Sequence, residues 1–99
     1  MSYRSLRRIG MIIKTIKAHK YRLLHQIFKY VNQEEIEEGV TTKVDRHTIK
    51  RMLKKLGEDG LIKVIPLTEQ DKTGQIIYLY TDPAFEPGFF LNYFELLKN

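Results

Sequence analysis

The chain has 99 residues, enough for one domain with a modest core. Hydrophobic residues make up 42% and charged residues 29%, which is typical of a folded domain and not of a disordered chain. The absence of cysteine excludes disulfide bonds and thiolate metal sites. Apolar runs are shorter than a bilayer span, and Lys14 and Lys17 interrupt the apolar stretch that a signal peptide would need. We therefore expect no membrane partner.

The net charge of +5 is unevenly distributed along the chain. Residues 1–30 contain basic side chains and no acidic ones, residues 43–55 are again strongly basic, and the chain from Glu58 onward is net acidic. This segregation favours an acidic partner, nucleic acid first, although charge runs are often no more than solvated faces. Between the basic segments lies an acidic block that we expect to be solvated or to bind a basic partner: Glu34, Glu35, Glu37 and Glu38.

Two helices are predicted in the first forty residues. Residues 3–20 form the first, because Leu6, Ile9, Ile13 and Ile16 recur at helical spacing and Ile12 widens this stripe, and Gly10 inside it would permit close packing. Residues 24–38 form the second helix, whose apolar face we place on residues 24, 27, 28 and 31 and whose end is at Gly39. The short segment 21–23 between them fits a first strand.

A third helix over residues 45–60 has the clearest pattern. Asp45 is a good N-cap, because its carboxylate can accept hydrogen bonds from the free N–H groups of the first turn. A buried stripe follows at helical spacing, and Gly60 can adopt the left-handed conformation that ends a helix, with Leu61 folding back onto the last turn. The stripe consists of Ile49, Met52, Leu53 and Leu56.

Beyond this helix the apolar pattern alternates, as in strands. Residues 61–65 form a strand that we expect to end at Pro66, and residues 75–81 form a second, with Ile76, Tyr78 and Tyr80 on one face. The turn-forming residues of the segment 67–74 make these strands a hairpin. Three helices followed by a hairpin predict an α+β, mainly α, winged helix-turn-helix fold.

The C-terminal segment is predicted to add a further helix. Residues 88–98 are apolar almost all round, and a helix of that kind either packs on the first helix or binds a partner. Phe89, Phe90 and Tyr93 are the candidates for partner contact. We expect one domain over residues 1–99, with a core at about 3–81 and an extension at about 82–99.

Opposite the buried stripe, the third helix carries a basic face suited to DNA. In helix-turn-helix proteins the corresponding helix lies in the major groove, so these cations would neutralise phosphates and read base edges. Arg46 and Arg51 are the better guanine readers, whereas the lysines suit phosphates. The alternative is that the cations only keep the helix surface soluble. The candidate nucleic-acid-binding residues are Lys43, Arg46, His47, Lys50, Arg51, Lys54 and Lys55.

Other candidate sites are weaker. The hairpin loop carries Glu69 and Asp71 against a single Lys72, so we expect little DNA contact from it and look instead to Lys43 and the basic residues of the first helix. The histidines at 19, 25 and 47 are scattered, which predicts no metal site, and no nucleophile or phosphate loop is readable. We therefore expect no enzyme activity, no cofactor and no small-molecule substrate.

Several stretches together resemble a known family: Leu6-Arg-Arg-Ile9, Glu38-Gly-Val40, Lys43-Val-Asp45 and Leu56-Gly-Glu-Asp-Gly-Leu-Ile62. The chain resembles the extended winged-helix domain of the largest, B-block-binding subunit of transcription factor IIIC. That resemblance implies a nuclear, multisubunit assembly that recruits RNA polymerase III to transfer RNA genes. It also implies the other subunits of the factor as partners, while double-stranded DNA is the partner that the basic face of the third helix predicts. Some winged helices of such assemblies bind DNA and others bind neighbouring subunits, and both roles remain open here.

Overall fold

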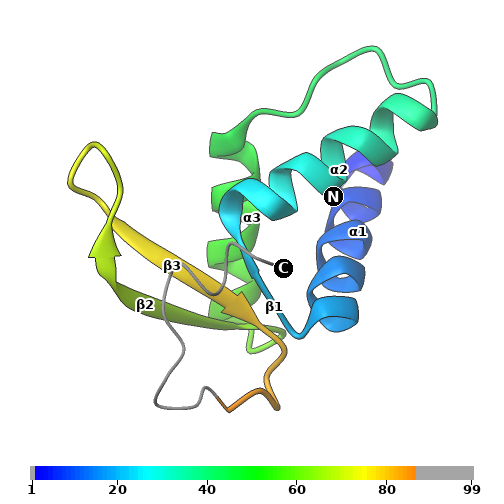
Figure 1. Ribbon diagram of the computed structural model, residues 1–99. Helices are drawn as coiled ribbons and strands as arrows, with labels where there is room; N and C mark the ends of the chain where they lie inside the picture. The colour runs from blue at the N-terminus through cyan, green and yellow to red at the C-terminus, as the bar shows by residue number, and fades with distance from the viewer. Residues whose placement is uncertain (1, 87–99) are drawn as a thin grey trace.

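The computed structural model describes residues 2–86, which form three helices and a three-stranded sheet. In chain order the elements are α1 (Tyr3–His19), β1 (Tyr21–Leu23), α2 (Leu24–Glu37), α3 (Arg46–Glu58), β2 (Lys63–Gln70) and β3 (Ile76–Thr81). Figure 1 shows the helices gathered on one side and the β2–β3 hairpin projecting from them. This arrangement confirms the predicted winged-helix fold. The expected helix over residues 88–98, with Phe89, Phe90 and Tyr93, lies outside the described residues.

The sheet is antiparallel in the order β1-β3-β2, which confirms the short first strand. The prediction that the next strand ends at Pro66 was wrong, because β2 continues to Gln70 and Pro66 lies opposite Tyr78. A proline is tolerated there because β2 is an edge strand, whose outward N–H groups have no ladder partner to lose. The register shifts between Pro66 and Gln70, so the second half of the hairpin pairs irregularly.

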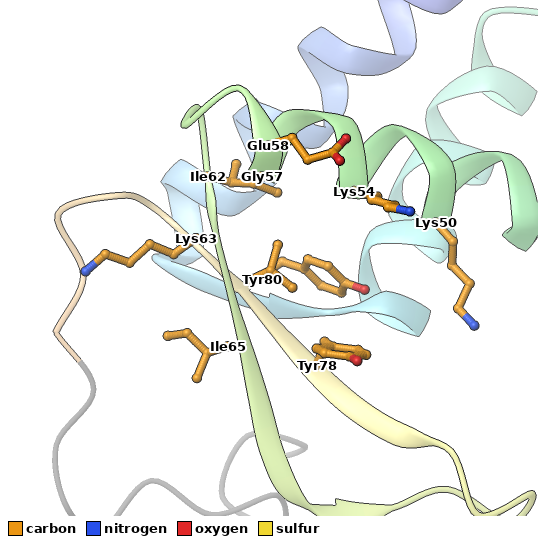
Figure 2. Close-up of a pocket in the computed structure, with 10 residues that line it drawn as sticks. Lys50, Lys54, Gly57, Glu58, Ile62, Lys63, Ile65, Tyr78 and Tyr80 are labelled. Atoms are coloured by element: carbon orange, nitrogen blue, oxygen red, sulfur yellow. The ribbon is translucent and has the colours of Figure 1, made fainter.

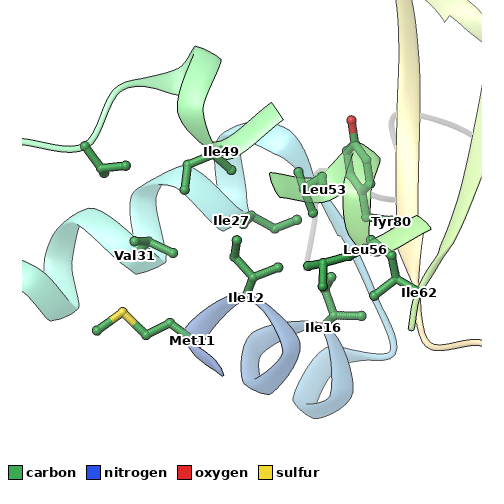
Figure 3. Close-up of a cluster of buried hydrophobic side chains, with 11 residues drawn as sticks. Met11, Ile12, Ile16, Ile27, Val31, Ile49, Leu53, Leu56, Ile62 and Tyr80 are labelled. Atoms are coloured by element: carbon green, nitrogen blue, oxygen red, sulfur yellow. The ribbon is translucent and has the colours of Figure 1, made fainter. Parts of the chain in front are cut away.

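The main core lies where the three helices meet β3. The predicted stripe of α3 is confirmed, since Ile49 and Leu53 are fully buried, Leu56 is nearly so, and Met52 packs against the same cluster. Ile27 and Val31 of α2 face this stripe (Figure 3). Truncating one such side chain to alanine typically costs about 2–5 kcal/mol. The stripe therefore determines which face of α3 is left to solvent.

The stripe predicted for α1 was partly wrong. The buried positions are Met11, Ile12, Thr15 and Ile16, whereas Leu6 is 57% exposed. A Cβ atom added at Gly10 would have no neighbour within 4 Å, so no other element packs closely against this glycine. The reason is that the first turns of α1 contact α2 through charged side chains. The spacing of apolar residues gives no information about such ion pairs.

Glycines end the second and third helices as expected. Gly39 and Gly60 have positive φ values of 80° and 76°, a conformation that glycine adopts without steric cost. After α3, the Leu61 N–H donates to the Leu56 carbonyl at 3.0 Å, closing the helix end. The Leu61 side chain itself is 51% exposed, and the neighbouring Ile62 enters the core instead.

A third glycine brings the hairpin close to α3. A Cβ atom built on Gly57 would lie 2.8 Å from Cγ2 of Val64 in β2. A glycine inside a helix lowers its stability, and this contact explains why one is present in α3, because a larger residue would clash with Val64. Gly57 therefore helps to set the position of the hairpin beside the basic face of α3.

Candidate nucleic-acid interface

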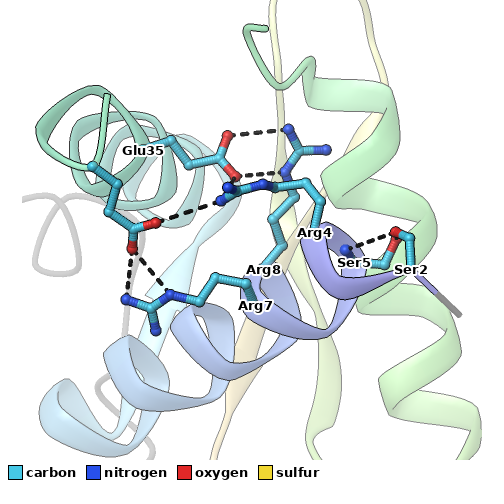
Figure 4. Close-up of polar contacts among 7 residues, drawn as sticks. Ser2, Arg4, Ser5, Arg7, Arg8 and Glu35 are labelled. Atoms are coloured by element: carbon cyan, nitrogen blue, oxygen red, sulfur yellow. Dashed lines mark hydrogen bonds and ion pairs between the residues drawn. The ribbon is translucent and has the colours of Figure 1, made fainter. Parts of the chain in front are cut away.

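The first basic cluster of the sequence, at the start of α1, is bound to acidic side chains of the same molecule. Arg8 donates to both carboxylate oxygens of Glu35 at 2.7 and 3.0 Å, and Arg4 approaches the same carboxylate at 3.4 Å. Arg7 donates to Glu38 at 2.6 and 3.0 Å. Figure 4 shows these guanidinium groups turned toward α2. The side chain of Glu35 is only 3% exposed, so the prediction of a solvated acidic block was wrong for it.

These ion pairs also change what α1 can offer to DNA. Hydrogen bonds from Arg7 hold the pKa of Glu38 below its usual range, and the same carboxylate raises the pKa of Arg7. Arg4, Arg7 and Arg8 are thus paired within the domain, so a contact of these side chains with the DNA backbone would have to compete with the ion pairs. On α1, Lys14 and Lys17 stay exposed, but they lie on a different helix from the basic face of α3.

The second basic cluster, on α3, is organised differently. A hydrogen bond from the Thr48 N–H to Asp45 Oδ1 at 2.7 Å caps the helix, and this bond lowers the pKa of Asp45. Within residues 2–86, Lys55 is the one predicted DNA contact that forms an ion pair, with Asp59 at 3.3 Å. All seven candidate residues are exposed: Lys43, Arg46, His47, Lys50, Arg51, Lys54 and Lys55.

Arg46 differs from the other candidates in having a fixed neighbour. Its guanidinium carbon lies 5.2 Å from the centre of the Phe28 ring of α2, within the range of a cation–π contact. Arg51 has no such contact among the described residues. Arg46 is therefore directed toward α2, whereas the exposed Arg51 is available to a ligand that binds the outer face of α3.

The acidic residue of the hairpin turn has a structural role. Asp71 Oδ1 accepts hydrogen bonds from the Thr73 N–H and hydroxyl and from the Gln75 N–H at 2.6–2.9 Å. Hydrogen bonds from the Thr73 hydroxyl and the Gln75 N–H are the main cause of its lowered pKa, and Lys50 contributes as a nearby positive charge. Asp71 is thus needed to hold the turn together, whether or not its charge also repels DNA. The sequence alone does not distinguish these two roles.

A groove between α3 and the hairpin was not predicted. It has a volume of about 750 Å³, an apolar floor from Ile62, Val64 and Tyr78, and Lys50 and Lys54 at its edge. Figure 2 shows the two lysines on α3 and the tyrosines on β3. Burial raises the pKa of Tyr80, at the back of this groove, to about 12. The alternating pattern of β3 placed its tyrosines on one face, but the pattern does not show that this face borders α3.

Residues 2–86 contain no group of three or more histidine and acidic side chains that could hold a metal ion. In the same part of the chain, no helix has the length and apolar character to cross a bilayer. Among the described residues, the basic face of α3 and the groove beside it are features that could bind a ligand.

Three helices followed by an antiparallel hairpin, with the third helix exposing its outer face, define the winged-helix class. A sequence model described as the GTF3C1 extended winged-helix domain matches residues 1–87, and the chain belongs to this family. The chain is 30% identical over 89 residues to general transcription factor 3C polypeptide 1 of Homo sapiens, and equally to those of Mus musculus and Rattus norvegicus. These matches cover 86% of this chain and 4% of each relative. No solved structure matches it significantly.

The family membership confirms the resemblance predicted from the sequence. The match ends at residue 87, so the predicted extension at residues 82–99 stays a prediction.

Proposed function

We propose that this winged-helix domain contacts double-stranded DNA through α3 as a non-catalytic part of a transcription factor IIIC subunit. In that role it contributes, in the nucleus, to recognition of the B-block of transfer RNA genes and to assembly of the RNA polymerase III initiation complex. The family membership supports the assembly, and the names of the relatives describe a general transcription factor.

The observation that carries the DNA contact is the exposed state of the basic face of α3. Cations that already have an acidic partner gain little from a phosphate, whereas unpaired ones release counterions from DNA. Arg51 has the planar fork that reads guanine, and Lys54 beside it suits a phosphate. Because Arg46 is directed toward α2, we assign it to the DNA backbone and not to a base.

A titration with duplex DNA at two salt concentrations tests this function. We expect binding at low salt that weakens at high salt, and its loss in the variant Arg51→Glu/Lys54→Glu. Both side chains are exposed, so the variant should keep its circular dichroism spectrum and melting temperature. Undetectable binding at low salt, or unchanged binding by the variant, would contradict the proposal.

A second candidate function is protein interaction without DNA contact, and the groove between α3 and the hairpin favours it. The partner would present an apolar or aromatic side chain to Tyr78 and Val64, with acidic residues placed to meet Lys50 and Lys54. The residues first assigned to partner contact, Phe89, Phe90 and Tyr93, belong to the same hypothesis.

Purified neighbouring subunits of the factor test this second function. Tyr78 is 39% exposed, so Tyr78→Ser should weaken binding of such a subunit while leaving the fold intact. If a subunit binds and Tyr78→Ser has no effect on its affinity, the groove is not the contact surface.

A further inference from the structure

A second hollow lies on the other side of Lys50, where α2, α3 and the hairpin approach one another. It has a volume of about 200 Å³, and its charged lining residues are His25, Arg46, Lys50 and Asp71. A water molecule occupies about 30 Å³ of liquid, so the hollow has room for a small anionic group. His25 comes from α2 and was not among the candidate DNA contacts.

The charges around this hollow are mainly positive. Burial lowers the pKa of His25, and the positive charges of Arg46, Arg22 and Lys29 lower it further. Arg22 comes from β1, Lys29 from α2 and Arg46 from α3, so cations approach His25 from three elements. An anion entering the hollow would relieve the repulsion among these groups.

Two of the lining groups are already held in position by the fold. The contact with the Phe28 ring fixes the Arg46 guanidinium beside the hollow, which reduces the entropy lost when it binds a ligand. Asp71, the one acidic lining group, has Oδ1 committed to the hairpin turn through Thr73 and Gln75. Its negative charge balances one of the two permanent cations of the lining, Arg46 and Lys50, and the other has no counter-charge within the hollow.

We infer that this hollow binds one backbone phosphate of the DNA, held by Arg46 and Lys50, with the protonated imidazole of His25 as a third donor. The inference rests on the proposed contact of α3 with DNA and extends that contact to α2. The phosphodiester remains intact, and the imidazole takes its proton from solvent as the DNA binds.

The consequence is a dependence of DNA affinity on pH. His25 has a lowered pKa in the free domain, and a neighbouring phosphate raises it, so the complex holds more proton than its separate components. Affinity therefore increases as the pH falls through the pKa of His25 in the complex. If DNA raises this pKa by about one pH unit, the affinity at low pH exceeds that at high pH by about tenfold.

The experiment measures anisotropy of a labelled duplex at constant salt between about pH 8 and pH 5, where histidine titrates. The wild-type chain is compared with His25→Gln and with His19→Gln, a control at an exposed histidine that does not line the hollow. In parallel, NMR follows the imidazole signals of His25 and His19 with and without the duplex. His19 is an internal control, since its pKa is also lowered by burial and by Arg22 but it does not line the hollow.

We expect weaker binding and a flatter pH profile for His25→Gln, an unchanged profile for His19→Gln, and a raised pKa for His25 but not for His19 when the duplex is added. If the pH profile of His25→Gln equals that of the wild type while Arg51→Glu/Lys54→Glu abolishes binding, the inference fails and the proposed function survives. If no duplex binds, the proposed function fails as well. If inorganic phosphate raises the pKa of His25 and the duplex does not, the hollow is an anion site unrelated to DNA.

Discussion

The start of α1 and the face of α3 are both rich in basic residues, yet the molecule uses them in opposite ways. Arg8 and Arg7 of α1 are bonded to Glu35 and Glu38, which lie 27 and 31 residues further along the chain. On α3 the cations are exposed, and Lys55 is the one with an acidic partner in the described part of the chain. A basic segment thus indicates a site for an anion only after the acidic groups of the same molecule have been placed.

The largest expected effect concerns the buried carboxylate of the α1 cluster. Glu35→Ala leaves the guanidinium of Arg8, whose side chain is only 13% exposed, without its counter-charge. Removing one partner of such a pair typically destabilises a protein by about 3–5 kcal/mol. Chemical denaturation of the variant measures this loss.

The matched control is Glu37→Ala in the same acidic block. Glu37 is exposed and accepts one hydrogen bond from Gln33 at 3.1 Å, so we expect a change within about 0.5 kcal/mol. Equal effects of the two substitutions would mean that the Arg8–Glu35 pair has no special role.

The two helices also differ in the surroundings of their internal glycines. At Gly10 in α1, alanine meets open space, and its better helix propensity should stabilise the domain by about 0.5–1 kcal/mol. At Gly57 in α3, the new methyl group meets Val64 at 2.8 Å, and an overpacked site typically costs about 1–3 kcal/mol. Because the propensity gain offsets part of this cost, we expect a net loss of about 1 kcal/mol.

Thermal or chemical unfolding measures the stability of both glycine variants. A third variant separates the steric clash at Gly57 from the change in helix propensity. In the double variant Gly57→Ala/Val64→Ala the contacting methyl group of Val64 is absent. Its loss of unfolding free energy should therefore be smaller than the sum of the losses in the two single variants. Stabilisation by Gly57→Ala alone would show that β2 adjusts freely to α3.

A smaller effect is expected from the cap of α3. The pKa of Asp45 is lowered from 3.8, so its ionised form stabilises the fold above that pH, and this contribution is lost as the pH falls through the lowered value. Asp45→Asn keeps a good N-cap without the charge, so stability near neutral pH should change little. Acid unfolding should show a smaller pH dependence for the variant, and an identical dependence would contradict the account.

The local features of the fold could be predicted from the sequence. The cap at Asp45, the end at Gly60 and the buried stripe with Ile49 and Leu53 each depend on neighbours within a few residues. Strand pairing was partly predictable, but the extension of β2 past Pro66 depends on its place at the sheet edge.

The misses have a common physical origin in contacts between distant parts of the chain. Leu6 has helical spacing with Ile9 and Ile13, but the first turns of α1 meet α2 through ion pairs such as Arg8–Glu35, and Leu6 is left 57% exposed. No local pattern places Arg8 beside Glu35 or Arg46 beside Phe28. The candidate DNA residues could be chosen from α3 alone, while the hollow with His25 required the folded arrangement of three elements.

The central claim is that the cations of α3, and not those of α1, contact DNA. Two variants with the same change in net charge test it most directly: Arg51→Ala/Lys54→Ala on α3 and Lys14→Ala/Lys17→Ala on α1, all at exposed positions. The measurement is the slope of the logarithm of the DNA association constant against the logarithm of salt concentration. Each lost phosphate contact reduces this slope by about 0.9, so the α3 variant, which loses Lys54 as a phosphate contact and Arg51 as a base contact, should lose about 1 and the α1 variant almost nothing. Equal losses in the two variants would contradict the account, because binding would then follow net charge and not the face of α3.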